Sequence, residues 1–177
     1  GCAKNLVDTE VMLGLLQQHG YTLTGAEQEA DILIVNTCGF IESAKLESIE
    51  TILELAHYKQ TGKCKALIVT GCMVQRYRDE LLREMPEIDA AIGTGEFTQI
   101  TDVIDRVFQE KGLLVVNEPT YIYSHKTPRV VTTPSYSAYV KIAEGCDNRC
   151  AYCVIPQIRG HFRSRPLESI VAEVRNL

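Results

Sequence analysis

The sequence predicts an α/β protein that opens with a parallel, doubly wound sheet domain. Short apolar runs rich in β-branched residues alternate with longer stretches of helical spacing, and the joints between them are short. This alternation is typical of a mostly parallel sheet with helices on both faces. A proline-rich stretch then separates it from a second strand-and-helix pattern. We therefore expect a sheet domain over residues 1–116, a linker over 117–137 and the start of a second α/β domain over 138–177.

The elements of the first domain follow from apolar periodicity. Unbroken apolar runs indicate buried parallel strands at residues 31–36, 66–70, 90–92 and 113–116. Helical spacing of apolar residues predicts helices over 7–19, 41–58, 74–85 and 100–109. Gly20 and Pro86 are natural stop signals after two of these helices.

The rest of the chain has a different composition. Residues 117–137 contain Pro119, Pro128 and Pro134 among many Thr, Ser and Tyr residues, which predicts an extended linker. A new strand is expected over 138–142, then a loop with three cysteines, then a helix from near Pro166 to the last residue. One such unit is too small to bury a core. We expect further chain after it, and also before Gly1, which is not a Met.

Composition excludes several classes of protein. With 45% hydrophobic and 23% charged residues, the 177-residue chain is neither disordered nor fibrous. No apolar run approaches the roughly 18 residues that cross a bilayer, and no secretory signal is visible. Residues 1–120 carry 10 Lys/Arg and 19 Asp/Glu, whereas 121–177 carry 8 and 4. An acidic front half disfavours a nucleic-acid substrate. It suits a basic protein partner, or it is simply a solvated face.

Seven cysteines are a high and odd number for a chain of this length. Without a secretory signal, an odd number argues against a disulfide framework. It favours metal or redox chemistry in a reducing compartment, so we expect a cytoplasmic protein.

Three of these cysteines occupy equivalent places in the predicted sheet. Cys38 and Cys72 each follow a strand and precede a helix, and Cys2 does the same if a strand precedes Gly1. Their separations of 36 and 34 residues each match about one strand–helix unit. Because the carboxyl ends of parallel strands share one edge, the three thiols should meet there. Neighbouring glycines, Gly39 and Gly71, should let the backbone approach a bulky inorganic group.

Three thiolates suit an iron–sulfur cluster with one free iron, or zinc with a fourth ligand other than cysteine. The alternative is a purely structural role, in which the cysteines pack as small hydrophobic residues. It is less favoured because three cysteines occupy equivalent places at strand ends. His19 and His57 are expected on the surface near helix ends, so an iron–sulfur cluster is favoured. Cys64 lies in a turn and is interpreted as an incidental free thiol.

The second set of cysteines is compact. Cys146, Cys150 and Cys153 form a C-x3-C-x2-C motif directly after the predicted strand. This spacing lets three thiolates reach three irons of one cubane cluster and differs from the paired C-x2-C motifs of structural zinc sites. Zinc completed by His161 is the alternative.

This motif, with an aromatic residue before its last cysteine, resembles the radical S-adenosylmethionine superfamily. The resemblance implies the first βα unit of a partial TIM barrel and a 4Fe–4S cluster held by the second cysteine set. It also implies a free iron that binds the amino and carboxylate groups of S-adenosylmethionine. Tyr152 would lie against the adenine.

Both cysteine sets together resemble the radical methylthiotransferases, in particular the branch that acts on a ribosomal protein. The stretches that carry this resemblance are 1–10 (GCAKNLVDTE), 36–41 (NTCGFI) and 71–77 (GCMVQRY). The tRNA branch typically has Gln-Met-Asn after the first cysteine and Ser-Val-Arg after the second. The stretches 154–160 (VIPQIRG) and 163–166 (RSRP) are similar to the family in general.

The resemblance implies an enzyme with two 4Fe–4S clusters that converts C–H to C–SCH3. The carbon would be the β-carbon of an aspartate in the small-subunit ribosomal protein numbered twelve. The auxiliary cluster on Cys2, Cys38 and Cys72 would hold the incoming sulfur. An external electron donor is implied, and we expect a monomer that binds no membrane. No Ser/His/Asp or Cys/His catalytic set is visible.

Two alternatives stay open. One is a methylthiotransferase acting on a tRNA adenosine of the isopentenyladenosine type. The other is a non-catalytic, metal-bearing binding module that docks through Arg159, Arg163 and Arg165. These arginines could equally be solvated, or could reach a carboxylate or phosphate of a substrate.

Overall fold

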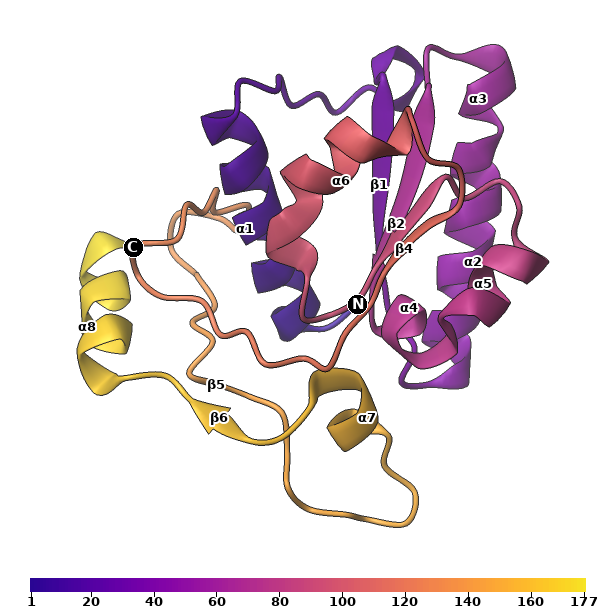
Figure 1. The fold of residues 1–177 in the computed structure, drawn as a ribbon. Helices are drawn as coiled ribbons and strands as arrows, with labels where there is room; N and C mark the ends of the chain where they lie inside the picture. Colours follow the sequence, from indigo (N-terminus) through magenta and orange to yellow (C-terminus); the bar gives the residue numbers. More distant parts are fainter.

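A four-stranded parallel sheet forms the centre of the computed structural model, which describes residues 1–177 (Figure 1). Its strands lie side by side in chain order: β1 (Ile32–Thr37), β2 (Ala66–Gly71), β3 (Ala90–Ile92) and β4 (Leu113–Val115). The predicted parallel α/β fold is therefore confirmed, and each strand lies within two residues of its predicted bounds.

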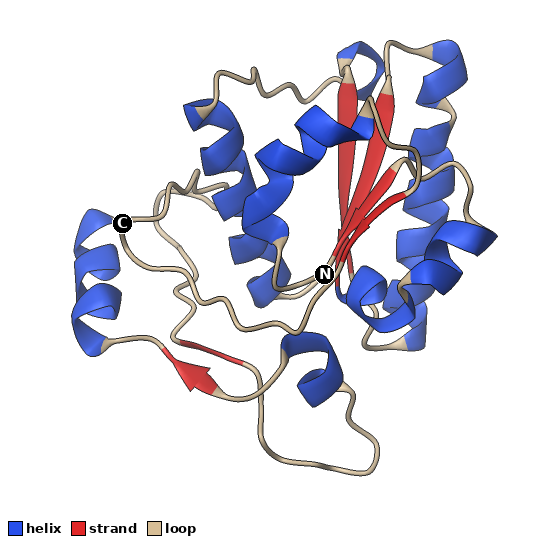
Figure 2. Ribbon diagram, in the orientation of Figure 1, coloured by secondary structure: helices blue, strands red, loops and turns tan.

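Helices cover both faces of this sheet (Figure 2). On one side are α1 (Ala3–Gln18), the 3-10 helix η2 (Phe97–Gln99) and α6 (Ile100–Val107). On the other are α2 (Glu42–Ala56), α4 (Cys72–Tyr77) and α5 (Asp79–Glu84). The short helices η1 (Glu27–Glu29) and α3 (Tyr58–Thr61) lie together at the opposite end of the sheet from the N-terminus.

Alternation along the strands builds two hydrophobic cores. Ile68 of β2 packs under α1 and α6, whereas its neighbours Leu67 and Val69 pack under α2, α4 and α5. All six residues of β2 are buried, as expected for a strand covered on both faces. The apolar runs that predict buried strands therefore hold the two helical layers together.

The predicted helix over 74–85 is wrong in one respect, because it is two helices. Arg78 lies between α4 and α5 with φ 46° and ψ −121°, a conformation that ends the first helix. The apolar periodicity continues through the break, so it could not reveal it. A further helix, α7 (Ile155–Arg159), lies in a segment that was expected to be loop, and it packs on α4.

The predicted strand at 138–142 is also wrong. The only strand nearby is β5 (Ala143–Glu144), which pairs antiparallel with β6 (Arg163–Ser164). A strand needs a continuous partner for its backbone groups. Here the partners are scattered: Lys141 N–H donates to the Tyr123 hydroxyl, and the side chain of Arg165 donates to the carbonyl of Lys141. One backbone bond, from Arg165 N–H to the carbonyl of Ile142, extends the β5–β6 pairing by a single residue.

Residues 116–142 contain no helix or strand but pack against the sheet domain. Tyr123 of this stretch is buried in the core beneath α1 and α6, and Val130 N–H donates to the carbonyl of Glu10 in α1. The chain then leads through β5, α7 and β6 to α8 (Leu167–Asn176). This last helix lies beside the stretch 116–142 (Figure 1). None of the helices has the length and apolar composition that crossing a bilayer requires.

Candidate metal centre

The three separated cysteines meet at the carboxyl edge of the sheet. Thr37 and Gly71, the last residues of β1 and β2, are register partners, so Cys38 and Cys72 directly follow the ends of two adjacent strands. Cys2 is the N-cap of α1, whose N-terminus lies at the same edge (Figure 1). All three cysteines line one cavity of about 360 Å³. The predicted meeting of the thiols is confirmed, whereas their role as metal ligands stays a prediction.

Asn5 joins the pieces of this cavity. Its Oδ1 lies 3.7 Å from the sulfur of Cys2 and 3.6 Å from that of Cys72, so both thiols can donate to it. Its Nδ2 donates to the carbonyl of Thr37 at 2.8 Å. One buried amide, one turn into α1, thus holds the start of that helix against the ends of two strands.

Other polar groups hold the loop that carries Cys38. The Ser48 hydroxyl of α2 accepts the backbone N–H of Cys38 at 3.2 Å. Arg76 of α4 donates to the carbonyl of Gly39 at 2.8 Å. The loop after β1 is therefore anchored to two helices, α2 and α4, of the same layer.

The two neighbouring glycines allow close packing of protein atoms around the cysteines. A Cβ on Gly39 would lie 2.9 Å from the Cα of Met73, and a Cβ on Gly71 would lie 2.6 Å from the carbonyl oxygen of Thr37. Gly71 also has φ +99°, which disfavours other residues. Both glycines therefore allow backbone to approach protein atoms, and their expected role in admitting an inorganic group stays a prediction.

The three cysteines that line the cavity differ in solvent exposure. Cys72 is buried, Cys38 is partly buried and Cys2 is exposed. Burial raises the pKa of the Cys72 thiol, and the guanidinium of Arg159 opposes that rise. The side chains of Phe40 and Ile41 line the same cavity and are half exposed, so they form an apolar rim beside the sulfurs.

The second cysteine set lies on a loop that begins and ends at this cavity. Gly145 and Ile155, which bracket the loop, both line the cavity of the first set. Cys146 N–H donates to the carbonyl of Gly160, and Cys153 N–H donates to that of Cys150. Cys146 borders a separate polar cavity of about 640 Å³.

Several predicted residues of this loop face solvent. Tyr152 is 89% exposed and Cys150 is exposed. His161 bonds Asp147 at 2.9 Å, with both side chains largely exposed. Nowhere in the chain do three or more His, Cys, Asp or Glu side chains converge as they would around a single metal ion.

The burial of the other residues singled out in the sequence tests their predicted roles. His19 and His57 are exposed at helix ends, as expected. Cys64 is a free thiol, but it is buried in the core under α2 and α5, and burial raises its pKa. The docking patch of three arginines is wrong, because Arg159 and Arg165 are buried and paired with carboxylates.

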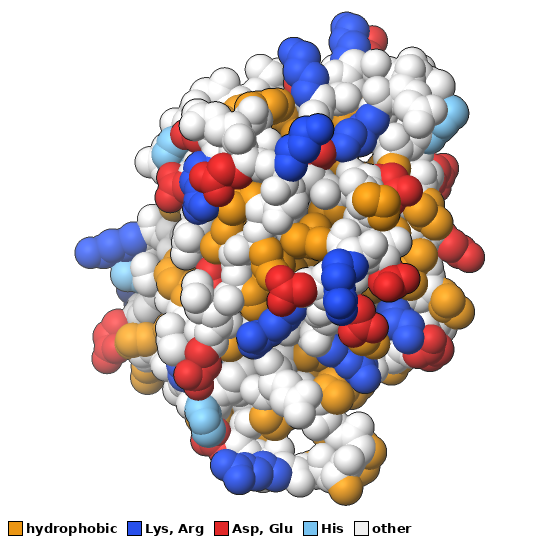
Figure 3. Space-filling view, turned by 45° about the vertical axis from the view of Figure 1, so that its right-hand side comes forward, with side chains coloured by type: hydrophobic (Ala, Val, Ile, Leu, Met, Phe, Trp, Pro, Cys, Tyr) orange, Lys and Arg blue, Asp and Glu red, His pale blue; other side chains and the backbone are white.

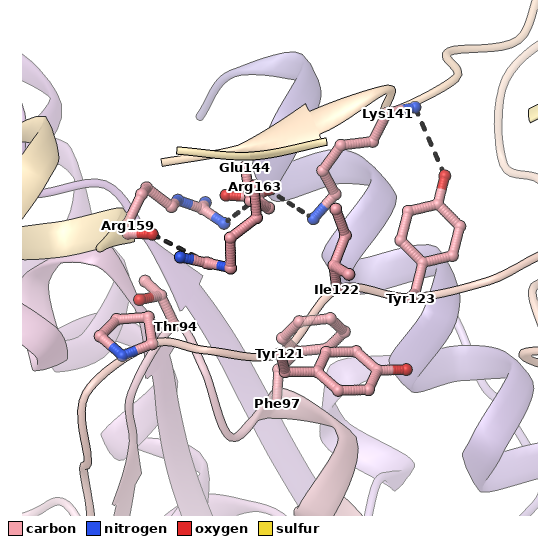
Figure 4. A pocket seen from close by; sticks show the side chains of 10 residues that line it. Thr94, Phe97, Tyr121, Ile122, Tyr123, Lys141, Glu144, Arg159 and Arg163 are labelled. Carbon is pink, nitrogen blue, oxygen red and sulfur yellow. Dashed lines mark hydrogen bonds and ion pairs between the residues drawn. The ribbon is translucent and has the colours of Figure 1, made fainter. Parts of the chain in front are cut away.

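Sequence reasoning missed the buried polar residues behind the cysteines. Arg159 pairs with Asp8, and Glu144 pairs with Lys141 at 2.8 Å. Figure 4 shows Glu144 between Lys141 and Arg159. Asp8 lies about one helical turn after Asn5 in α1, and Asn5, Asp8 and Glu10 are polar residues among the apolar ones that this helix buries, a signal that could have pointed to them.

Residues 1–93 match the uncharacterized protein family UPF0004. The chain belongs to this family. Over the whole chain, it is 62% identical to a ribosomal protein uS12 methylthiotransferase, RimO, from Desulforamulus reducens. Proteins of the same name from Heliobacterium modesticaldum and Pelotomaculum thermopropionicum are 58% and 54% identical over the whole chain. The chain spans 40%, 38% and 40% of the lengths of these three relatives.

These matches confirm the predicted resemblance to the methylthiotransferase family and to its ribosomal-protein branch. The alignments to the relatives cover both cysteine sets, because each spans the entire chain, whereas the family match over residues 1–93 covers only the first set.

Proposed function

We propose that this chain is part of a radical S-adenosylmethionine methylthiotransferase that modifies an aspartate of ribosomal protein uS12. The observation that carries the proposal is the shared cavity of Cys2, Cys38 and Cys72, to which the loop of the second cysteine set is joined at both ends. The names of the relatives support the reaction and the substrate. Residues 1–116, 117–137 and 138–177 would be the cluster domain, the linker and the start of the radical domain.

The thiols fit an iron–sulfur cluster better than a single ion. Cysteine ligands of a cubane bind different irons, so their sulfurs spread around the cluster instead of converging on one point. Three sulfurs around a cavity of about 360 Å³ are compatible with that arrangement. Cys2, Cys38 and Cys72 would hold an auxiliary 4Fe–4S cluster, and Cys146, Cys150 and Cys153 the radical-generating one.

When bound, S-adenosylmethionine and the two clusters supply the hydrogen-abstracting radical and the methylated sulfur. The chain's own residues position the cysteines and shield the cavity from water. Asn5 holds the start of α1 against the carbonyl of Thr37, and Ser48 holds the backbone at Cys38. Phe40 and Ile41 keep one side of the cavity apolar. Tyr152, which is exposed, would pack on the adenine once the cofactor binds.

The proposal includes the cellular setting. A ribosomal substrate places the enzyme in the cytoplasm, and the radical chemistry requires an external electron donor. We propose that the enzyme acts as a monomer. The tRNA-modifying alternative remains a second outcome of the experiment below.

The test uses the full-length enzyme, reconstituted anaerobically with iron and sulfide. We expect about eight irons per chain and methylthiolation of uS12 but not of tRNA. Replacing Cys72→Ala should remove about half of the iron and abolish product, because one cluster loses a ligand. Cys64→Ala is the matched control, because Cys64 is a second buried cysteine and lies outside the cavity. This variant should keep its full iron content and its product formation. Modification of tRNA, zinc without sulfide, or full iron in Cys72→Ala would overturn the proposal.

A further inference from the structure

Arg159 connects the far end of the chain to the first cysteine set. It lies at the end of α7 and is only 4% exposed. One guanidinium nitrogen lies 2.8 Å from the Oδ1 of Asn5 and 3.6 Å from the sulfur of Cys72. The other donates to Asp8 at 2.6 Å. A buried cation therefore touches one sulfur of the cavity and the amide that lies beside two of them.

The charges around Arg159 are balanced without the thiols. Arg159 and Lys141 are the buried cations, and Asp8 and Glu144 are the buried anions that pair with them. Figure 4 shows both cations directed toward Glu144. Thiolate ligands at the cavity would add negative charge to this neutral group, and Arg159 is the cation in direct contact with one of them.

Arg159 is also tied to the second cysteine set through its backbone. The next residue, Gly160, accepts the backbone N–H of Cys146 at 3.1 Å. A Cβ on Gly160 would lie 2.5 Å from the carbonyl oxygen of Pro119, and its φ is +73°, so this approach requires glycine. The position of the guanidinium is therefore set by the segment that carries the second motif.

We infer that Arg159 is a positioning residue that donates an N–H···S hydrogen bond to Cys72 and raises the reduction potential of the cluster on the first cysteine set. Hydrogen bonds to ligand sulfurs and nearby positive charge favour the reduced, more negative form of a cluster. This inference rests on the proposed function, since it requires that the first cysteine set holds a redox-active cluster. Neither the family match nor the names of the relatives assign a role to Arg159.

The experiment measures the potential of the first cluster alone. In the full-length enzyme, Cys146, Cys150 and Cys153 are replaced by Ala, and the chain is reconstituted anaerobically. The midpoint potential is followed by electron paramagnetic resonance during a redox titration. The test variant is the double substitution Asp8→Asn with Arg159→Gln, which removes one buried charge of each sign and so leaves no unpaired carboxylate at Asp8.

We expect the double variant to have a ratio of reduced to oxidised cluster at least tenfold lower at a fixed potential, equivalent to a midpoint about 59 mV lower for one electron. Arg159→Lys keeps the charge but loses the planar donor group, so it should shift the potential in the same direction by less. Arg163→Gln is the matched control and should leave the potential unchanged, because Arg163 donates only to the carbonyls of His161 and Arg159.

The outcomes separate the two proposals. If the chain with Arg159 intact takes up no iron and sulfide, the proposed function fails at the first cluster. If the cluster forms and the potential is unchanged in either Arg159 variant, the function stands and the inference is wrong. The Lys variant keeps the test decisive where the double variant does not fold.

Discussion

Tyr123 shows at the scale of a residue how burial in this fold changes an ordinary side chain. Its hydroxyl donates to the carboxylate of Glu173 at 2.9 Å, and the guanidinium of Arg165 stacks 4.2 Å from its ring centre. Burial and the Glu173 carboxylate raise the pKa of Tyr123 from 10 to about 12. The sequence identified Tyr123 only as one aromatic residue in a linker.

The pKa of Tyr123 predicts a loss of stability in alkali. Because the folded pKa is above the unfolded one, its contribution is complete below pH 10 and disappears as the pH rises from 10 to 12. Two pKa units correspond to about 2 to 3 kcal/mol. Urea unfolding at pH 9 and 11 should show the unaltered chain losing about 1 kcal/mol more than Tyr123→Phe. Equal losses in both proteins would contradict the assigned pKa.

At the scale of elements, the clearest departure from periodicity is the break between α4 and α5. Arg78 has a positive φ, and it is the only residue other than glycine that does. The break lets α4 end beside α7 while α5 packs Leu81 into the core under α2. Helical spacing of apolar residues describes both helices and is silent about the joint, because one residue of unusual backbone barely shifts the pattern.

The strained backbone at Arg78 predicts a stabilising substitution. Arg78→Gly should raise the free energy of unfolding by about 1 kcal/mol, since glycine adopts this conformation without strain. Arg78→Ala removes the same side chain but keeps the strain and should give no such gain. Arg83→Gly, in the exposed part of α5, should instead cost about 1 kcal/mol. Chemical denaturation of the three variants checks the order, and a gain in Arg78→Ala would show that the side chain is responsible.

At the scale of the whole molecule, one buried network joins three distant segments. Arg129 pairs with Glu10 of α1 and with Glu173 of α8, both at 2.6 Å. Glu173 in turn accepts from Arg165. The outer surface contrasts with this interior, because Lys, Arg, Asp and Glu side chains are interspersed on the face shown in Figure 3. The buried charges therefore form specific pairs, whereas the charges on that face are mixed without an evident pattern.

Removing the Arg129 side chain should weaken the packing of the segment 116–142 against the sheet domain. Arg129→Met leaves two buried carboxylates without their shared partner, which should cost about 3 to 5 kcal/mol. Arg106→Met breaks an exposed pair with Glu110 and should have no measurable effect. Thermal unfolding compares the two variants. Equal melting temperatures would mean that the buried pairs contribute no more than the surface pair.

Several features of this protein could be predicted from its sequence, because they depend on local periodicity and on spacing along the chain. The four strands and most of the helices follow from apolar runs and helical spacing. The meeting of Cys2, Cys38 and Cys72 follows from parallel strands, whose equivalent ends share one edge. The cysteine spacing of 146–153 and its resemblance to a family were likewise available from the letters alone.

Only the tertiary structure decided which polar residues stand behind the cysteines. Asn5 and Arg159 are 154 positions apart and still share a hydrogen bond. No periodicity links such positions, because their contact depends on how the second part of the chain folds over the sheet edge. For the same reason the stretch at 138–142 has a strand-like sequence but no strand, since side chains of Tyr123 and Arg165 bond part of its backbone and a single backbone bond, to Ile142, makes no ladder.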